Sequence, residues 1–365
     1  MRPNVRLDRY KRFYKGKKVL VTGHTGFIGS WLTKVLSMSN SRVLGYSLNL
    51  PTSPSMYDAI RLRKGLMDLR KDVRDKESLK KAIQEFEPEI VFHLAAQPTV
   101  LESYNNPVET FETNVMGTVN LLESLRRVGS AKVIIVMTSD KVYRNNEWVY
   151  PYRETDPLGG KDPYSASKSS QDIVVNSFRE SYFDSMGVGI SSIRAGNVIG
   201  GGDWGAHRIV PDAIRAITEK RSISIRNPQA VRPWQYVLDP ISGMLELAQK
   251  MWSNLEFSDD WNFGPVNSKP ITVKELAEAI INYWGAGSYR IGKGKNNDAK
   301  ESNYLQLDSS KARMKLNWFT PYDFEETVRE TIEWYRKYYN KKDIDSETET
   351  QIKRYTERRN DLWRE

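Results

Sequence analysis

Short apolar runs alternate with stretches of helical periodicity along the first half of the chain, and this rhythm constrains the fold more than any other feature. The apolar runs predict strands at Lys18–Thr22, Arg42–Ser47, Leu69–Val73, Glu89–Leu94, Lys132–Thr138 and Val188–Arg194. The stretches between them predict helices at Phe27–Met38, Lys76–Phe86, Pro107–Val128 and Asp162–Met186. Because strands that alternate with helices form parallel sheets with a helical layer on each face, we expect an α/β fold built on a doubly wound parallel sheet.

The pattern changes from Gly200 onward, where the chain is mostly helical with short strands and Arg226–Pro233 is rich in basic residues and proline. We therefore expect a second, smaller and mostly helical domain that covers a ligand bound to the first. The end of the chain alternates charges, which is typical of a solvated helix or a partly disordered tail. The expected segments are a basic arm (1–16), the sheet domain (17–199 and 235–262), the smaller domain (200–234 and 263–340) and the charged tail (341–365).

The 365 residues include no cysteine and three histidines. The missing cysteines exclude a disulfide framework, a zinc–thiolate site and a cysteine nucleophile, and so few histidines argue against a histidine metal site. We therefore expect no bound metal. The apolar stretches are too short to cross a membrane, and the basic start lacks the apolar core of a signal peptide. These features predict a cytoplasmic protein without a membrane partner.

The net charge of +9 comes from basic residues that are scattered along the chain. A nucleic-acid partner would be indicated by a basic helix or a nucleic-acid-binding motif, and the sequence has neither. Solubility, together with attraction for an anionic small molecule, accounts for this charge more simply. We expect no nucleic-acid partner.

A glycine-rich turn follows the first predicted strand and opens the first predicted helix. Glycines allow a tight turn and a close approach of the backbone to a pyrophosphate, and the helix N-terminus offers free N–H groups and a partial positive charge. The GxxGxxG spacing differs from the GxGxxG of the main dinucleotide fingerprint, so a purely structural turn is the alternative. We expect a Rossmann-like, dinucleotide-binding sheet domain whose cradle is Gly23, His24, Thr25, Gly26, Phe27, Ile28 and Gly29.

The end of the second strand bears on the choice of cofactor. An acidic residue there would bind the ribose 2′-hydroxyl of NAD, but the stretch contains neither an acid nor an arginine. Ser47 or Asn49 could contact the ribose as neutral groups, and we expect NAD. Asp72 and Val73 follow the third strand and are placed to meet the adenine edge, although Asp72 could instead cap the next segment.

Two polar clusters predict the reactive centre. Tyr164 and Lys168 are four residues apart, which puts them on one face of a helix, where the ammonium favours the phenolate and the tyrosine can remove a hydroxyl proton. Ser139, Asp140 and Lys141 follow the fifth strand, at the edge where open α/β sheets bind ligands. The alternatives are a turn cap for Asp140 and an exposed ion pair for Lys141.

From Lys17 to Tyr339 the chain resembles the extended short-chain dehydrogenase/reductase family, whose members bind NAD. The residues that carry the resemblance are Gly23–Gly29, Asp72-Val73, His93–Ala96, Asn114–Thr118 and Tyr164–Lys168. The resemblance implies further cofactor contacts from Leu94, Ala95, Ala96, Thr113, Thr138, Tyr164 and Lys168. It also implies a homodimer or a dimer of dimers, because the helices predicted at 107–128 and 162–186 resemble those that pair in a four-helix interface in this family.

Longer stretches resemble the nucleotide-sugar 4,6-dehydratases of that family, and in particular the branch that acts on CDP-glucose. These stretches are Thr138–Tyr143, Trp148–Ser167, Arg194–Trp204, Arg208–Asp212 and Arg226–Pro240. The resemblance implies that Tyr164, aided by Lys168 and Ser139, starts the oxidation at C4 of the sugar. It then implies Lys141 as the base at C5, where the dTDP-glucose and GDP-mannose enzymes use glutamate, and Asp140 as the acid that protonates the departing 6-hydroxyl.

Candidate substrate contacts come from the same stretches. Guanidinium groups suit phosphate oxygens, so Arg208 and Arg232 are expected to bind the diphosphate, with surface ion pairs as the alternative. The remaining candidates are Gln97, Asn197, Gln235 and Tyr236. Leu101 stands where the resemblance predicts a basic residue. Other functions that stay open are a 4-epimerase, a dehydratase of dTDP-, UDP- or GDP-sugars, and a non-catalytic dinucleotide sensor.

Overall fold

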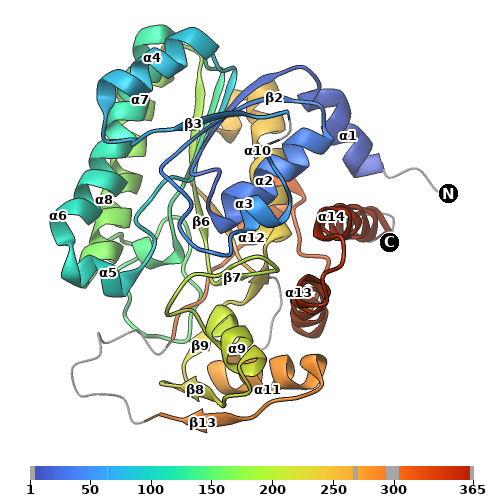
Figure 1. The fold of residues 1–365 in the computed structure, drawn as a ribbon. Helices are drawn as coiled ribbons and strands as arrows, with labels where there is room; N and C mark the ends of the chain where they lie inside the picture. The colour runs from blue at the N-terminus through green and yellow to red at the C-terminus, as the bar shows by residue number, and fades with distance from the viewer. Residues whose placement is uncertain (1–4, 64, 266–269, 293–303, 362–365) are drawn as a thin grey trace.

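A computed structural model of the chain describes residues 5–63, 65–265, 270–292 and 304–361. Its central strands are β1 (Lys18–Thr22), β2 (Arg42–Ser47), β3 (Met67–Arg70), β4 (Ile90–His93), β5 (Val133–Met137), β6 (Gly189–Ala195) and β11 (Trp261–Phe263). They form one seven-stranded sheet in the order β11-β6-β5-β4-β1-β2-β3, and every neighbouring pair is parallel (Figure 1). The predicted doubly wound parallel sheet is thereby confirmed.

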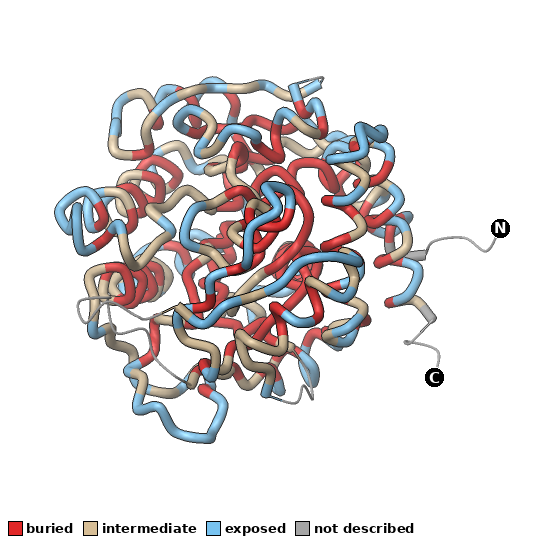
Figure 2. The backbone as a smooth tube through the Cα atoms, turned by 60° about the horizontal axis from the view of Figure 1, so that its bottom comes forward, coloured by how far each residue is buried: buried red, intermediate tan, exposed pale blue. Residues whose placement is uncertain are grey.

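Helices cover both faces of this sheet. They are α4 (Lys76–Phe86), α7 (Gly117–Val128) and α8 (Pro163–Phe178) on one face, and α2 (Phe27–Met38) and α10 (Leu238–Ser253) on the other. Successive strand residues face opposite sides of the sheet. Leu20 of β1 therefore packs into the core under α4, α7 and α8, while Val19 and Val21 pack into the core under α2 and α10. Buried residues accordingly run through the middle of the molecule (Figure 2). Among the described helices, none has the length and apolar character to cross a membrane.

Three predicted elements differ from the structure by more than one residue at an end. The third strand is β3 (Met67–Arg70), because the chain turns at Asp72, whose carboxylate accepts a hydrogen bond from the Arg74 backbone N–H. The predicted helix at 107–128 is divided into α6 (Pro107–Phe111), a π-helical turn at Glu112–Met116, and α7. The predicted helix at 162–186 ends as α8 at Phe178 and continues into a second π-helical turn.

A smaller group of elements lies at the carboxyl end of the sheet, at the bottom of Figure 1. Its strands are β8 (Ile223–Ile225), β9 (Val231–Arg232), β12 (Ile271–Thr272) and β13 (Tyr289–Ile291), and its helices are α9 (Ile209–Thr218) and α11 (Val273–Trp284). Strand β8 pairs with β13, and β9 pairs with β12. A further pair, β7 (Val198–Ile199) with β10 (Gln235–Tyr236), connects this group to the sheet domain.

Both ends of the described chain are packed helices, which corrects the expectation of a basic arm and a solvated tail. Helix α1 (Val5–Tyr14) packs against α14 (Ile344–Asp361), and the two lie side by side in Figure 1. The alternating charges of α14 conceal a stripe at helical spacing that is buried: Ile344, Thr348, Gln351, Ile352, Tyr355 and Arg359. The Arg359 guanidinium is fully buried and donates to Glu246 of α10.

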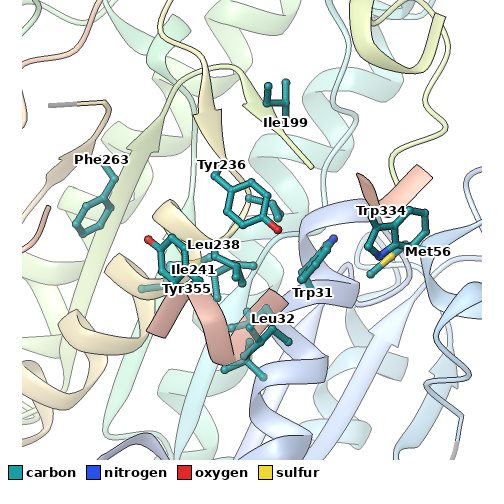
Figure 3. Close-up of a cluster of buried hydrophobic side chains, with 14 of the residues drawn as sticks. Trp31, Leu32, Met56, Ile199, Tyr236, Leu238, Ile241, Phe263, Trp334 and Tyr355 are labelled. Carbon is teal, nitrogen blue, oxygen red and sulfur yellow. The ribbon is translucent and has the colours of Figure 1, made fainter. Parts of the chain in front are cut away.

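Tyr355 shows how deeply this last helix enters the core. Its ring lies beside Tyr236 and near Ile241 (Figure 3), with 6.0 Å between the two tyrosine ring centroids. Its hydroxyl donates to the Asp239 carboxylate over 2.7 Å. The C-terminal helix therefore completes the core on the α10 face of the sheet.

Tyr355→Ala is expected to lower the free energy of unfolding by about 3–5 kcal/mol, because it leaves a cavity and deprives a buried carboxylate of its partner. Urea unfolding followed by circular dichroism would measure this. The matched control is Arg358→Ala on the exposed side of the same helix, for which we expect a change within about 0.5 kcal/mol. Equal stabilities for the two variants would contradict the packed position of α14.

Candidate active site

The glycine turn lies where the strand order reverses, between β1 and β4, which is the usual ligand-binding position of an open α/β sheet. Gly23 has a φ of 75°, and a Cβ there would lie 2.7 Å from the Leu94 carbonyl carbon and the Ala95 nitrogen. A Cβ on Gly29 would lie 2.1 Å from the Gly23 carbonyl oxygen. The outer glycines are therefore required by the close packing of the chain's own backbone.

The same turn presents the N-terminus of α2. Gly26 is the N-cap residue, and no side chain caps this end of the helix. Its first N–H groups and its partial positive charge are therefore directed to the crevice, as a cofactor pyrophosphate requires. Thr25 is buried, while Phe27 and Ile28 are half-buried in the first turn of the helix. The predicted cradle thus has the local geometry of a phosphate-binding turn.

His24 anchors this turn from below. Its ring is fully buried, and its Nε2 lies 2.9 Å from the Asp68 carboxylate of β3. A Cβ at Gly45 of β2 would lie 2.4 Å from the imidazole, so that glycine makes room for the ring. Burial lowers the pKa of His24 to about 4, and the Asp68 carboxylate opposes this shift. His24 is consequently a neutral structural residue at neutral pH.

Arg70 is a charged group that the sequence analysis did not find at the end of β2. It lies on β3, in register with Ser47, and its guanidinium donates to the Leu48 carbonyl over 3.3 Å. Its Nε also pairs with Asp68 at 2.7 Å. The prediction considered only the end of β2 and the residues after it, where Ser47 is buried and Asn49 is exposed. The neighbouring strand β3 places a guanidinium beside this end, and strand register is a property of the sheet that one segment does not reveal.

Asp72 and Val73 have structural roles in the turn after β3. Both Asp72 carboxylate oxygens are engaged by Arg74, one by its backbone N–H and the other by its guanidinium. The Val73 side chain is buried in the core and would lie 2.8 Å from a Cβ on Gly117. The capping alternative therefore describes the Asp72 side chain, and its role toward a cofactor stays a prediction.

The other predicted cofactor contacts surround the same crevice. The backbone N–H groups of Leu94 and Ala95 both donate to the Thr22 hydroxyl over 3.2 Å, which fixes the loop after β4 against β1. Ala96 is half-buried in that loop, and Thr113 is half-buried in the π-helical turn before α7. Thr138 is buried at the end of β5, where its hydroxyl donates to Asp172 over 2.9 Å.

Ser139, Asp140 and Lys141 form the start of a short 3-10 turn directly after β5. The Ser139 hydroxyl donates to Asp140 over 3.0 Å and accepts the Lys141 backbone N–H over 3.2 Å. It also lies near enough to the Tyr164 phenol to lower the pKa of that group. Within the described part of the chain, no carboxylate lies within ion-pair distance of the Lys141 amine. The structure thus brings together the strand-end cluster and the tyrosine.

Helix α8 supplies the tyrosine and the second lysine. Asp162 caps its N-terminus by accepting the Ser165 backbone N–H over 2.9 Å, and Pro163 occupies its first turn, so the start of the helix is well defined. Tyr164 and Lys168 are buried on one face. The Lys168 amine donates to Gln171 over 2.8 Å and to the Met137 carbonyl at the end of β5 over 3.3 Å.

Burial is the largest influence on the charges of these groups. It raises the pKa of the Asp140 carboxyl, against the lowering effect of Lys141, and Oδ2 of Asp140 has no hydrogen-bond partner. Burial also raises the pKa of Tyr164 to about 12 and lowers that of Lys168 to about 7. The expected activation of the phenol by lysine is therefore outweighed by burial in the protein alone. At neutral pH the site favours a neutral phenol and a partly protonated Lys168.

The two arginines that were predicted to bind phosphate, Arg208 and Arg232, belong to the smaller group of elements, at the start of α9 and on β9. Arg208 pairs with Asp203 at 3.0 Å, and its charge lowers the pKa of Tyr164. Arg232 is buried on β9, and its charge lowers the pKa of Asp140. Asn197 is half-buried beside them, and its carbonyl accepts the Gln235 backbone N–H. Two cations therefore face the reactive cluster.

Three other candidate substrate contacts differ in what they offer. The Gln97 side chain is engaged by the Thr99 backbone N–H and by Thr110. Gln235 donates to the Phe263 carbonyl, while its Oε1 is buried without a partner. The expected substrate contact by the Tyr236 side chain is corrected by the structure. This side chain is fully buried in the core and its hydroxyl donates to Gln351 of α14, so it presents no polar group to a ligand.

A buried ionic cluster supports the site and was missed by the sequence analysis. The Arg194 guanidinium, at the end of β6, donates to Asp172 over 2.8 Å and to Asp260 over 3.0 Å. Asp172 lies one helical turn after Lys168, which is the signal that could have identified it. Arg194 and Asp260 are far apart in sequence, so their pairing gave no local signal.

No group of acidic or histidine side chains in the described ranges has the arrangement of a metal site.

Comparisons with known proteins identify the family of the chain. Residues 20–331 match the family model described as GDP-mannose 4,6 dehydratase. A CDP-glucose 4,6-dehydratase of Salmonella typhimurium is 45% identical over 340 residues, which cover 92% of this chain and 94% of that relative.

Solved structures have the same fold. A UDP-glucose 4-epimerase of Thermus thermophilus in complex with NAD is 27% identical, with a TM-score of 0.75 over 87% of this chain and 99% of that one. DesIV of Streptomyces venezuelae, a dTDP-glucose 4,6-dehydratase, is 21% identical with a TM-score of 0.77, covers 89% of this chain and 98% of its own, and supports the fold alone. The match to the family model covers most of the chain, and the chain therefore belongs to the GDP-mannose 4,6-dehydratase family.

Proposed function

We propose that this chain is an NAD-dependent nucleotide-sugar 4,6-dehydratase, a hydro-lyase that converts CDP-glucose to CDP-4-keto-6-deoxyglucose and water. The observation that carries the proposal is the position of the Asp140 carboxyl. It is buried with one oxygen unpartnered, it precedes Lys141 directly, and the Ser139 hydroxyl lies between it and Tyr164. Besides a hydride acceptor, oxidation of a hydroxyl requires only the tyrosine and Lys168. An added acid and amine support elimination of water from the same sugar.

The turn from Gly23 to Gly29 fits a dinucleotide, since its backbone N–H groups and the uncapped start of α2 suit a pyrophosphate. Bound NAD supplies a reversible acceptor for the hydride that leaves C4 of the sugar and later returns to C6. Because the hydride is returned, the overall reaction consumes no oxidant, and tight retention of the cofactor is expected. The 45% identity to the CDP-glucose 4,6-dehydratase of Salmonella typhimurium supports CDP-glucose as the substrate.

The first step is removal of the O4 proton by Tyr164. Burial raises the pKa of this phenol to about 12, so positive charge is needed to make it a base at neutral pH. Arg208 and the nearby Ser139 hydroxyl both lower the pKa of the phenol. Lys168, one helical turn further along α8, adds charge when it is protonated. The 4-ketone that results makes the C5 hydrogen acidic.

The second step is the elimination of water across C5 and C6. We assign the acid to Asp140, because burial raises its pKa and so favours the protonated carboxyl that can protonate the departing 6-hydroxyl. We assign the base at C5 to Lys141. After hydride returns to C6, Lys141 gives its proton back to C5. The proton that Tyr164 took from O4 replaces the one that Asp140 gave to the leaving water, so all three groups return to their starting states.

The diphosphate of the substrate is assigned to Arg208 and Arg232. Arg208 is held by Asp203 with one terminal nitrogen engaged, and Arg232 comes from the facing strand β9. Guanidinium groups bind phosphate oxygens with charge-assisted hydrogen bonds. Asn197 and the unpartnered Oε1 of Gln235 are further candidates on the same side of the site.

The substrate is tested by incubating the protein with NAD and, separately, CDP-glucose, dTDP-glucose, UDP-glucose and GDP-mannose. We expect the 4-keto product, detected by its absorbance in alkali, with CDP-glucose and at least tenfold less with the others. Turnover of another sugar and not of CDP-glucose would overturn the substrate. Release of a 4-epimer without a keto product would overturn the dehydratase.

Lys141→Ala is expected to retain hydride transfer from C4 but to lose exchange of the C5 hydrogen with solvent. The reason is that the amine which removes this proton is gone, and general-base catalysis contributes about 10²–10⁴-fold. Mass spectrometry of the sugar after incubation in D₂O measures the exchange. Lys81→Ala, an exposed lysine of α4, is the matched control. Undiminished exchange in Lys141→Ala would remove this residue from the role.

We also propose that the chain forms a homodimer through α6 and α8. Three apolar side chains on these helices and the turn that follows are exposed, Val108 by 70%, Ile173 by 56% and Tyr182 by 41%. Helices α6 and α8 are in contact with each other, so the side chains form part of one surface. A second copy related by a two-fold axis would cover both helices with the same pair.

Ile173→Asp is expected to shift the protein from dimer to monomer, because it places a charge at the centre of an apolar interface. Light scattering coupled to size exclusion measures the mass. Met314→Asp, at the most exposed apolar side chain among those described, leaves the mass unchanged if the interface is on α6 and α8. A monomeric parent protein would contradict the proposal.

A further inference from the structure

A continuous row of buried polar side chains connects Lys168 to the glycine turn. Lys168 and Gln171 belong to α8, Thr118 to α7, His93 to β4 and Thr22 to β1. Lys168 is 3% exposed, and the other four are fully buried. The proposed reaction uses Lys168 alone, so the remaining members of the row have no role in it so far.

The direction of each hydrogen bond follows from the proton of each hydroxyl. Thr118 has one hydroxyl proton, which it donates to the Asn114 carbonyl over 2.8 Å. It can therefore only accept from its other two neighbours, Gln171 Nε2 at 2.8 Å and His93 Nε2 at 3.0 Å.

The histidine is fixed in the same way from its other side. The Thr22 hydroxyl oxygen already accepts two backbone N–H groups, so it donates its own proton to His93 Nδ1 over 2.7 Å. His93 is thus neutral, with its proton on Nε2, and burial lowers its pKa to about 3. A neutral imidazole that donates to Thr118 keeps the threonine oxygen committed as an acceptor.

These constraints determine the orientation of the Gln171 amide. Its Nε2 must face Thr118, and its Oε1 must therefore face Lys168, whose amine donates to it over 2.8 Å. The Met137 carbonyl accepts a second Lys168 proton over 3.3 Å. A reversed amide would direct N–H groups at an ammonium. Two of the three Lys168 N–H groups are therefore held by the protein.

We propose that Gln171 is a positioning residue for Lys168, and that Thr118 and His93 act through it by fixing the direction of its amide. Gln171 gives the ammonium an uncharged acceptor inside the protein. The row therefore maintains Lys168 in the charged and oriented form that assists Tyr164. This inference rests on the proposed function for the role of Lys168, but its geometry does not.

The charged and titratable groups around Lys168 set the sign of the expected effect. Burial lowers its pKa to about 7, and Asp172 on the same helix raises it, although Asp172 is also engaged by Arg194. His93, the facing group on β4, is neutral, and Tyr164 is a neutral phenol at neutral pH. Without the Gln171 oxygen the ammonium loses an acceptor, so its pKa falls further and the charged form is lost at a lower pH.

The experiment compares three variants as holoenzymes: Gln171→Leu removes the amide, Thr118→Val removes its anchor with little change in volume, and Thr118→Ser is the matched control that retains the hydroxyl. The titration of Lys168 is followed directly by NMR of protein with ¹³C at lysine Cε, with Lys168→Met for assignment. We expect the midpoint to fall by about one pH unit in the first two variants and to stay unchanged in the third.

The pH profile of kcat provides the second readout. In Gln171→Leu and Thr118→Val its alkaline limb is expected to move down by about one pH unit, which is roughly a tenfold loss at pH 8 with little change in KM. A merely structural role would lower kcat by the same factor at every pH. In the double variant Gln171→Leu/Thr118→Val, the alkaline limb should shift no further than in Gln171→Leu, because both substitutions act on the same amide.

The outcomes separate the two proposals. An unchanged Lys168 midpoint in Gln171→Leu, or an equal shift in Thr118→Ser, overturns the positioning role whatever the protein turns over. A shifted midpoint in a parent protein that makes no 4-keto product supports the positioning role and overturns the proposed function alone.

Discussion

The arrangement of the candidate site depends on one buried guanidinium, that of Arg194. It joins Asp172 of α8 to Asp260, which lies just before β11. Thr138, at the end of β5, also donates to Asp172. Three strand ends and the helix that carries Tyr164 and Lys168 are therefore tied at a single point. Removing one partner of such a buried pair typically costs about 3–5 kcal/mol, since it leaves an uncompensated charge. The ionic cluster of Arg194, Asp172 and Asp260, rather than the reactive residues themselves, therefore holds the end of β5 against α8.

Burial has opposite consequences for the groups that this arrangement brings together. Charged forms are disfavoured in a dry site, so the same environment raises the pKa values of Asp140 and Tyr164 and lowers that of Lys168. A carboxyl that retains its proton suits an acid, and an amine that loses its proton easily makes the charge of Lys168 sensitive to its hydrogen bonds. The neutral acceptor on Gln171 acts on that sensitive group.

Local patterns predicted those parts of the molecule that depend on neighbours in sequence. The strand–glycine–helix context located the turn at 23–29, and the four-residue spacing placed Tyr164 and Lys168 on one helical face. The charge alternation of the last helix misled the prediction, because a buried stripe that ends in Arg359 contains polar residues. Arg70 beside Ser47 and Asp260 beside Arg194 are contacts across the sheet, and only strand register and topology reveal them.

The position of α14 has a consequence for the order in which the protein can fold. Gln351 and Tyr355 of α14 bind Tyr236 and Asp239, in the segment that follows the site residues Arg232 and Gln235. Because a chain is made from its N-terminus, this segment lacks these packing partners until α14 has been synthesised. The sheet around β1–β5 can form before then, but the substrate side of the crevice is completed only once α14 is present. A nascent chain would thus acquire the nucleotide-binding half of its site well before the half that carries out chemistry on a sugar.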